Sequence, residues 1–249
     1  MSHYFTNDNI DSKEVKTKCV IDDYEFSFIT DNGVFSKRGL DFGTRSLLLS
    51  LKDISGEVLD FGCGYGPIGI FLKKKFDCNV DMIDINKRAI GLAKKNALLN
   101  NVSVNVFESN IYDSVIKKYD YIITNPPIRV GKEILHKILF DAKNYLKENG
   151  KVFFVIHKDQ GAKTLAKVLE REYKVEIVDK NKGFYIICLI FNWHFYYDLI
   201  HFNMATCILL YMYFINYIVI GVREWLIKLK NLVITEKEEI TPKQKTLLN

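Results

Sequence analysis

The feature that most constrains the fold is an alternation of short apolar runs with stretches of helical period between Glu57 and Phe191. The apolar runs are rich in Val, Ile and Phe, which is typical of buried strands. Strands that alternate with helices in this way form a parallel sheet with helices on both faces. The expected strands are Glu57–Phe61, Asn79–Asp84, Ser103–Glu108, Tyr119–Thr124 and Lys151–His157, and the expected helices lie around Gly69–Phe76, Arg88–Asn100 and Lys132–Lys147.

The end of this alternating region has a different pattern. Val175–Asp179 and Phe184–Phe191 are separated only by Lys180-Asn181-Lys182-Gly183. That link is too short for a helical crossover, so the two runs should pair as an antiparallel hairpin. The sequence therefore predicts an α/β fold whose mostly parallel, Rossmann-like sheet closes with an antiparallel strand.

Three segments are expected along the 249 residues, a length that allows one α/β domain with a modest appendage. Residues 1–50 form a preface that caps one end of the site. It contains a strand pair within Cys19–Thr30, a turn at Asn32-Gly33 and a helix at Thr44–Leu51. Residues 51–191 form the catalytic domain, and residues 192–249 form an atypical hydrophobic tail.

The tail contains an uncharged apolar stretch, Met204–Val222, that is long enough to span a bilayer. Asn216 lies in its middle and no second such stretch accompanies it. A helix that packs on the domain or on a second copy, and an extension without a function of its own, are the alternatives. We do not expect membrane association.

Composition and charge restrict the class of protein. A composition of 48% hydrophobic and 26% charged residues is typical of a folded protein. A net charge of +5 is compatible with binding to phosphate backbones, but many cytosolic enzymes are equally basic. The N-terminus lacks a secretory signal pattern, so we expect the cytoplasm. The cysteines have no zinc-ligand spacing, so neither a metal site nor a disulfide framework is expected at Cys19, Cys63, Cys78, Cys188 and Cys207.

The first motif is a glycine-rich turn, Asp60-Phe61-Gly62-Cys63-Gly64-Tyr65-Gly66, between a strand and a helix. Glycines at such a turn let the backbone approach a ligand closely. The G-x-G-x-G spacing differs from the G-x-G-x-x-G pattern that binds a pyrophosphate, so the ligand need not be a dinucleotide. Taken alone, the turn could also be a tight strand-to-helix connection.

The second motif is Asp84, which ends the next strand in Asp84-Ile85-Asn86. The carboxyl ends of neighbouring parallel strands share one edge of the sheet, which places the Asp84 carboxylate beside the glycine-rich turn. A carboxylate there can accept hydrogen bonds from both ribose hydroxyls of a nucleoside. The alternative is that Asp84 caps the helix that follows.

The third motif is Asn125-Pro126-Pro127, which follows the fourth strand. Two prolines restrict the backbone, so the Asn125 amide oxygen and the Pro126 carbonyl can face one point as a pair of acceptors. An NH2 group offers two donors to that point, and its lone pair is then aimed at an electrophilic methyl group. An ordinary Asn-Pro turn is the alternative.

Together these motifs resemble the class I methyltransferases of the methyltransferase small domain group, especially the RsmC-like 16S rRNA guanine-N2 methyltransferases. The resemblance covers residues 1–191 and is carried also by the continuation of the third motif to Lys132 and by two preface motifs, Gly33-Val34-Phe35-Ser36 and Leu40-Asp41-Phe42-Gly43-Thr44. It implies a sheet that closes with an antiparallel strand and S-adenosylmethionine as the methyl donor. By the same resemblance Asp60, Gly62 and Gly64 hold the methionine end, Asp84 holds the ribose and Asn110 meets the adenine.

The resemblance also implies substrate residues. Many base methyltransferases have an aromatic ring after the two prolines that stacks on the flipped base, and here the residue is Ile128. Stacking must then come from elsewhere, for which Phe35 is our candidate. Arg129 and Lys132 could contact RNA phosphates, or be ordinary solvated cations.

The main hypothesis is methyl transfer to the exocyclic N2 amine of a guanine, with ribosomal RNA or the small ribosomal subunit as partner. The first alternative is a methyltransferase for a glutamine side chain of a protein such as a release factor, because an amide NH2 suits the same acceptors. The second is a non-catalytic RNA-binding protein on the same fold.

Overall fold

The computed structural model describes residues 11–127 and 131–191, together with a few residues of the C-terminal tail (Leu209, Tyr211, Met212, Ile215, Val222, Arg223 and Leu226). The chain divides into two units, Met1–Trp193 and His194–Asn249. The first unit includes the segments expected at residues 1–50 and 51–191. Of the stretch Met204–Val222 most residues lie outside the described ones, and no helix among the described residues is long and apolar enough to cross a membrane.

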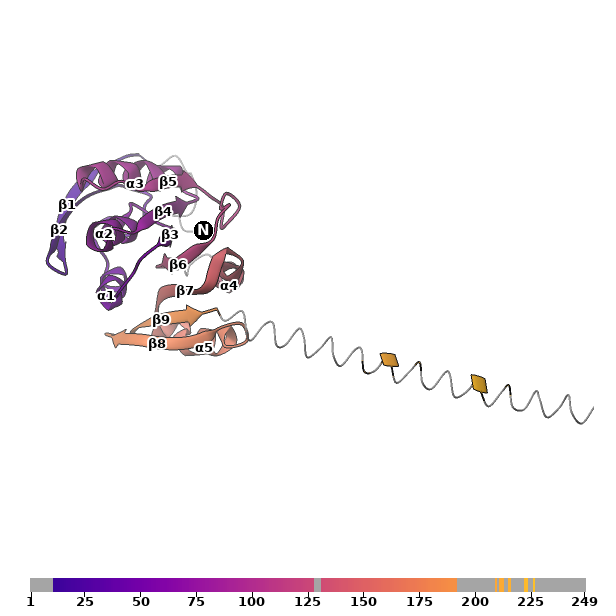
Figure 1. Ribbon diagram of the computed structural model, residues 1–249. Helices are drawn as coiled ribbons and strands as arrows, with labels where there is room; N and C mark the ends of the chain where they lie inside the picture. Colours follow the sequence, from indigo (N-terminus) through magenta and orange to yellow (C-terminus); the bar gives the residue numbers. More distant parts are fainter. Residues whose placement is uncertain are drawn as a thin grey trace, which may run out of the picture. The chain divides into compact units, whose positions relative to one another are not determined.

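The centre of the first unit is a seven-stranded sheet with the order β5-β4-β3-β6-β7-β9-β8 (Figure 1). Neighbouring strands among the first five are parallel, whereas β9 runs antiparallel to both β7 and β8. This arrangement confirms the expected Rossmann-like fold and its closing hairpin. The strands are β3 (Glu57–Phe61), β4 (Asn79–Asp84), β5 (Asn105–Glu108), β6 (Tyr119–Thr124), β7 (Leu146–His157), β8 (Lys174–Asn181) and β9 (Phe184–Ile190).

The strand order reverses at β3, which lies between β4 and β6. The chain first proceeds outward from β3 through β4 to β5, and then returns to place β6 on the other side of β3. In open α/β sheets the crevice for a ligand lies at such a reversal, beyond the carboxyl ends of the strands. The fold therefore brings the ends of β3, β4 and β6 to one place.

Helices cover both faces of the sheet (Figure 1). One buried cluster joins one face to α1 (Phe42–Ser50), α2 (Pro67–Phe76) and α3 (Lys87–Leu99), and a second joins the other face to α4 (Lys132–Asp141) and α5 (Ala162–Leu169). Successive residues of β3 alternate between the clusters, since Val58 belongs to the first and Leu59 to the second. Burial on both faces explains why the strands read as continuous apolar runs.

The preface begins with a two-stranded antiparallel hairpin, β1 (Val15–Ile21) and β2 (Tyr24–Thr30). Asn96 of α3 and Asn100, the C-cap of this helix, pair with the free edge of β2 as a neighbouring strand would. Asn100 exchanges two hydrogen bonds with the backbone of Ser27, of 3.0 and 2.7 Å, and Asn96 exchanges two with Ile29, of 2.7 and 2.9 Å. The hairpin is thereby fixed to the sheet through α3.

The largest departures from the expected elements lie between α4 and β8. The helix expected over Lys132–Lys147 ends at Asp141, and a 3₁₀ turn follows before β7 begins at Leu146. β7 starts earlier than expected because Leu146 already pairs with Tyr119, ahead of a shift in register. Helix α5 was not expected at all, although its buried residues, Ala162, Leu165, Ala166 and Leu169, have helical spacing.

Candidate functional site

The glycine-rich turn that joins β3 to α2 leaves open space beside its backbone. Gly62 and Gly64 have φ angles of 68° and 57°, in the left-handed region that favours glycine. Apart from the glycine and its two chain neighbours, the described part of the chain places no atom within 4 Å of a Cβ built on either residue, whereas a Cβ on Gly66 would lie 2.9 Å from Cε of Met82. The first two glycines therefore leave room for a ligand, and the third is required by packing.

Asp60, the last but one residue of β3, is an acid buried behind this turn. Its side chain is inaccessible to solvent, and its Oδ2 accepts a 2.8 Å hydrogen bond from the backbone N–H of Gly69. Its Oδ1 has no hydrogen-bond partner among the described residues. Burial, together with the smaller effect of the nearby Asp84 carboxylate, raises the pKa of Asp60 to about 8, although the hydrogen bond from Gly69 acts in the opposite direction. A cationic ligand group would satisfy the unpaired oxygen.

Asp84 ends β4 and lies directly beside the turn. Its Oδ2 accepts a 2.8 Å hydrogen bond from the N–H of Gly64, and its Oδ1 accepts one of 2.8 Å from Asn86. Asn86, not Asp84, caps α3, because its side chain accepts from the N–H groups of Arg88 and Ala89. Burial raises the pKa of Asp84, and the hydrogen bonds that its carboxylate accepts from the backbone reduce this rise. Each oxygen of a carboxylate can accept two hydrogen bonds, so Asp84 keeps acceptor capacity for a ligand.

Asn125 follows β6, at the same edge of the sheet because β6 pairs with β3. Its Nδ2 donates a 2.9 Å hydrogen bond to Oγ1 of Thr44 and lies 3.4 Å from Oδ1 of Asp41. Both partners belong to the preface, at the start of α1. Sequence reasoning did not assign them to the site, although Asp41 and Thr44 have the spacing of a helix N-cap and its third helical residue. Of the two prolines, Pro126 is buried and Pro127 is half-buried.

The other expected site residues are more peripheral. Asn110 follows β5 and is held near Asp84, because the N–H of its neighbour Ser109 donates to the Asp84 carbonyl at 3.0 Å. Its exposed side chain donates a 3.3 Å hydrogen bond to Asp113. Phe35 is 50% exposed.

The segment that contains Phe35 is bound to the start of α3, where the Asn86 side chain donates to the Gly33 carbonyl at 3.1 Å. Lys132 is exposed at the start of α4. Ile128 and Arg129 lie outside the described residues.

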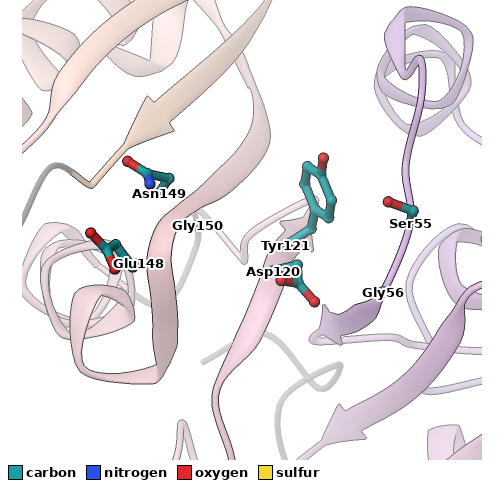
Figure 2. A pocket seen from close by; sticks show the side chains of 7 residues that line it. All are labelled: Ser55, Gly56, Asp120, Tyr121, Glu148, Asn149 and Gly150. Carbon is teal, nitrogen blue, oxygen red and sulfur yellow. The ribbon is translucent and has the colours of Figure 1, made fainter.

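A separate pocket lies at the opposite edge of the sheet, near the amino ends of β3 and β6 (Figure 2). Its acid Asp120 is already engaged, because Oδ2 accepts a 2.8 Å hydrogen bond from the N–H of Glu57 and lies 2.7 Å from Nζ of Lys147. Neither the glycine-rich turn nor Asn125 contributes to this pocket. Its lining residues are Ser55, Gly56, Asp120, Tyr121, Glu148, Asn149 and Gly150.

Among the solved structures similar to this chain is the Thermus thermophilus 16S rRNA N2 G1207 methyltransferase in complex with AdoMet and guanosine. The TM-score is 0.66 at 21% identity, and the match covers 72% of this chain and 51% of the other. At this identity the likeness establishes the fold.

Sequence relatives are more similar. An uncharacterized protein of Bacillus subtilis, YbxB, is 42% identical over 170 residues, which are 66% of this chain and 85% of the relative. Ribosomal RNA small subunit methyltransferase C of Psychromonas ingrahamii is 38% identical over 55% of this chain. The match spans only 41% of that relative's length. A putative protein N5-glutamine methyltransferase of Methanocaldococcus jannaschii is 35% identical over 53% of this chain and 78% of its own.

The family model of the methyltransferase small domain matches residues 25–188, which begin in the β1–β2 hairpin and end in the last strand of the sheet. The match includes the glycine-rich turn, Asp84 and Asn125. The chain therefore belongs to the methyltransferase small domain family of S-adenosylmethionine-dependent methyltransferases.

Proposed function

We propose that this methyltransferase modifies the exocyclic N2 amine of a guanine in 16S ribosomal RNA. The observation that carries the proposal is the orientation of Asn125. Its amide nitrogen is engaged by Thr44, so its amide oxygen is left as an acceptor at the edge where the strand order reverses. An acceptor at this place suits an NH2 group.

The residues beside the turn fit S-adenosylmethionine. The unpaired Oδ1 of Asp60 would attract the ammonium of the methionine end, and the open space at Gly62 and Gly64 would admit its chain. The remaining acceptor capacity of Asp84 suits the two ribose hydroxyls, and Asn110 would meet the adenine. When bound, this cofactor supplies a methyl group on a positively charged sulfur.

The acceptors at Asn125 would hold the amine for the transfer. The Asn125 Oδ1 and the Pro126 carbonyl accept its two N–H groups, which leaves the nitrogen lone pair directed at the methyl group. Because the lone pair would attack before the nitrogen loses a proton, no strong base is needed, and alignment of the amine with the methyl group would supply most of the rate enhancement. As the carbon–nitrogen bond forms, the bond between the methyl group and the sulfur would break, and the methylated nitrogen would release one proton to water.

Several features favour RNA as the substrate. The chain carries a net charge of +5, and neutralisation of phosphates by Lys and Arg supplies much of the affinity of RNA-binding proteins. Arg129 and Lys132 come shortly after Asn125-Pro126-Pro127 in the sequence and are our candidates for phosphate contacts. The ring of Phe35, 50% exposed, is our candidate for stacking on the base.

A glutamine side chain of a protein is the second candidate substrate. It is favoured by the relative from Methanocaldococcus jannaschii, whose name gives this activity and of which this chain covers 78%. A glutamine amide presents the same NH2 group to Asn125. The two candidates therefore differ in what surrounds the amine and not in how the amine is held.

One experiment separates these candidates. The purified protein is incubated with methyl-labelled S-adenosylmethionine and either small ribosomal subunits from cells that lack the gene or release factors from the same cells. We expect label in 16S rRNA, recovered as N2-methylguanosine by nucleoside mass spectrometry. Label in glutamine of a release factor would establish the alternative, and label in neither would refute both.

Asn125→Ala tests the role of the amide in the same assay. Loss of one preorganised polar group should slow single-turnover methylation about a hundredfold to a thousandfold. Cofactor affinity should stay near that of the wild type, because Asn125 is not expected to contact the cofactor. A variant with near wild-type turnover would contradict the mechanism, and one that fails only through lost cofactor affinity would assign Asn125 to the cofactor pocket.

A further inference from the structure

We infer that Asp41 and Thr44 are positioning residues that determine which side of the Asn125 amide is presented to the substrate amine. The inference rests on the proposed function of Asn125 and extends it into the preface, which contributes none of the three sequence motifs. It is carried by three side chains in a row, from the N-terminus of α1 to the end of β6.

The row is connected by short hydrogen bonds. The Thr44 hydroxyl donates to Oδ2 of Asp41 at 2.6 Å, and the Thr44 N–H donates to Oδ1 of the same carboxylate at 2.9 Å. The Asn125 Nδ2 in turn donates to the Thr44 hydroxyl oxygen at 2.9 Å. Thr44 is only 2% exposed, so water does not readily replace these bonds.

The direction of every bond in this row follows from the carboxylate. An ionised carboxylate only accepts, so the Thr44 hydroxyl must give it its single proton. The hydroxyl oxygen can then only accept from its other neighbour, which requires the NH2 side of the Asn125 amide to face it. The opposite orientation would place the Asn125 oxygen against two acceptors with no proton between them. The Asn125 oxygen is therefore turned away from Thr44 and is free to accept from a substrate amine.

The start of α1 is held firmly enough to serve this purpose. Gly43 packs so closely on Phe184 of β9 that a Cβ would lie 2.9 Å from its Cε1. The rings of Phe42 and Phe184 are 5.7 Å apart between centroids. β9 pairs with β7, and β7 pairs with β6. The start of α1 and Asn125 are therefore held by strands of the same sheet.

Capping alone does not explain a carboxylate at residue 41. Asn and Ser cap a helix about as well as Asp, because each offers an oxygen to the backbone N–H groups of the first turn. Only an acceptor-only group, however, forces the Thr44 hydroxyl to point away from Asn125. Asp41→Asn should therefore keep the cap but allow the hydroxyl to turn toward Asn125 and its amide to flip.

The test compares four variants with matched effects on α1. Asp41→Asn keeps the cap and removes the directing charge, and Thr44→Val keeps the shape and removes the hydroxyl. Thr44→Ser keeps the hydroxyl and is the rescue. Ser50→Ala is the control, because the Ser50 hydroxyl donates to the Ser46 carbonyl within α1 at 2.8 Å and takes no part in the row from Asp41 to Asn125. Thermal unfolding and cofactor affinity are measured for all four.

In single-turnover methylation, Asp41→Asn and Thr44→Val should each slow transfer about a hundredfold, the scale of a small misplacement of a reacting group. Cofactor affinity should stay within about threefold, and Thr44→Ser and Ser50→Ala should stay near the wild-type rate. Asp41→Asn should have no further effect in the Asn125→Ala background, since the two changes act through one group. A full additional loss there, or wild-type rates for both Asp41→Asn and Thr44→Val, would overturn the inference.

A second readout does not depend on catalysis. The side-chain NH2 signal of Asn125 in a ¹⁵N NMR spectrum, assigned by its absence in Asn125→Ala, should be protected from exchange in the wild type and in Thr44→Ser. It should lose protection or split in Asp41→Asn. An identical signal in Asp41→Asn would refute the directing role even if the protein methylates no substrate tried. Normal turnover of Asn125→Ala would instead refute the proposed function.

Discussion

The unpaired acid behind the glycine-rich turn makes stability depend on pH in a defined direction. Burial raises the pKa of Asp60 to about 8 in the folded protein, whereas an unfolded aspartate titrates near 3.9. Between these values the folded state holds a proton that the unfolded state has lost. The contribution of Asp60 is therefore fully present below about pH 4 and is lost as the pH rises toward 8.

The size of the effect follows from the same difference. While the folded carboxyl is protonated and the unfolded one is ionised, each pH unit changes the free energy of unfolding by about 1.4 kcal/mol. From pH 5.5 to 7.5 the wild type should thus lose about 2.5 kcal/mol through Asp60 alone. Asp60→Asn cannot ionise and should lack this loss, although its amide leaves a buried donor where Oδ1 stands.

The assay is reversible urea unfolding of both proteins at pH 5.5 and 7.5, with the difference between them as the measured quantity. The other titrating groups are common to both proteins and cancel, apart from Asp84, whose charge interacts with that of Asp60. Asp77→Asn is the control, because Asp77 is exposed and its ion pair with Lys73 lowers its pKa, away from this window. If wild type and Asp60→Asn lose stability in parallel between the two pH values, Asp60 is ionised in the folded protein and the argument fails.

Four further changes test the cofactor pocket, its packing and the domain boundary. Asp84→Ala should weaken S-adenosylmethionine binding by roughly 1 to 3 kcal/mol through lost hydrogen bonds to a charged acceptor; unchanged affinity in calorimetry would remove Asp84 from the site. Gly64→Ala should cost about 1 kcal/mol of stability through its left-handed backbone but abolish most cofactor binding. Gly69→Ala should unfold more easily, by about 1 to 3 kcal/mol, because its Cβ would lie 2.6 Å from Sδ of Met82; equal binding losses in both glycine variants would contradict this distinction. Deletion of residues 192–249 should leave a folded, cofactor-binding protein, since β9 already closes the sheet, and an unfolded product in circular dichroism would place the tail in the core.

The centre of the sheet could be predicted from the sequence because its inner strands are buried on both faces and read as apolar runs. The hairpin of β8 and β9 followed from the length of one link. The start of β7 could not be read in the same way, because Lys147-Glu148-Asn149-Gly150 is polar and Leu146 is brought into the sheet only by pairing with Tyr119.

The site likewise has contacts that could be predicted from the sequence and contacts that could not. The closeness of Asp84 to the glycine-rich turn was predictable because parallel strands end at one edge of a sheet. The partners of Asn125 were not, since Asp41 and Thr44 lie 84 and 81 residues before it. Nothing local in the sequence indicates which preface residues reach the end of β6.

The pairing of β2 with Asn96 of α3 and with Asn100, the C-cap of this helix, has a consequence for how the protein is made. The partners are separated by 73 residues for Ser27 and Asn100, and by 67 for Ile29 and Asn96. At a synthesis rate of about 5 to 20 residues per second, the hairpin leaves the ribosome several seconds before the helix that covers its edge. Ser27 and Ile29 then expose unpaired backbone groups that another nascent strand can bind. A pause in translation between β2 and α3 should therefore lower the yield of folded protein, and replacement of both asparagines should do so even at normal speed.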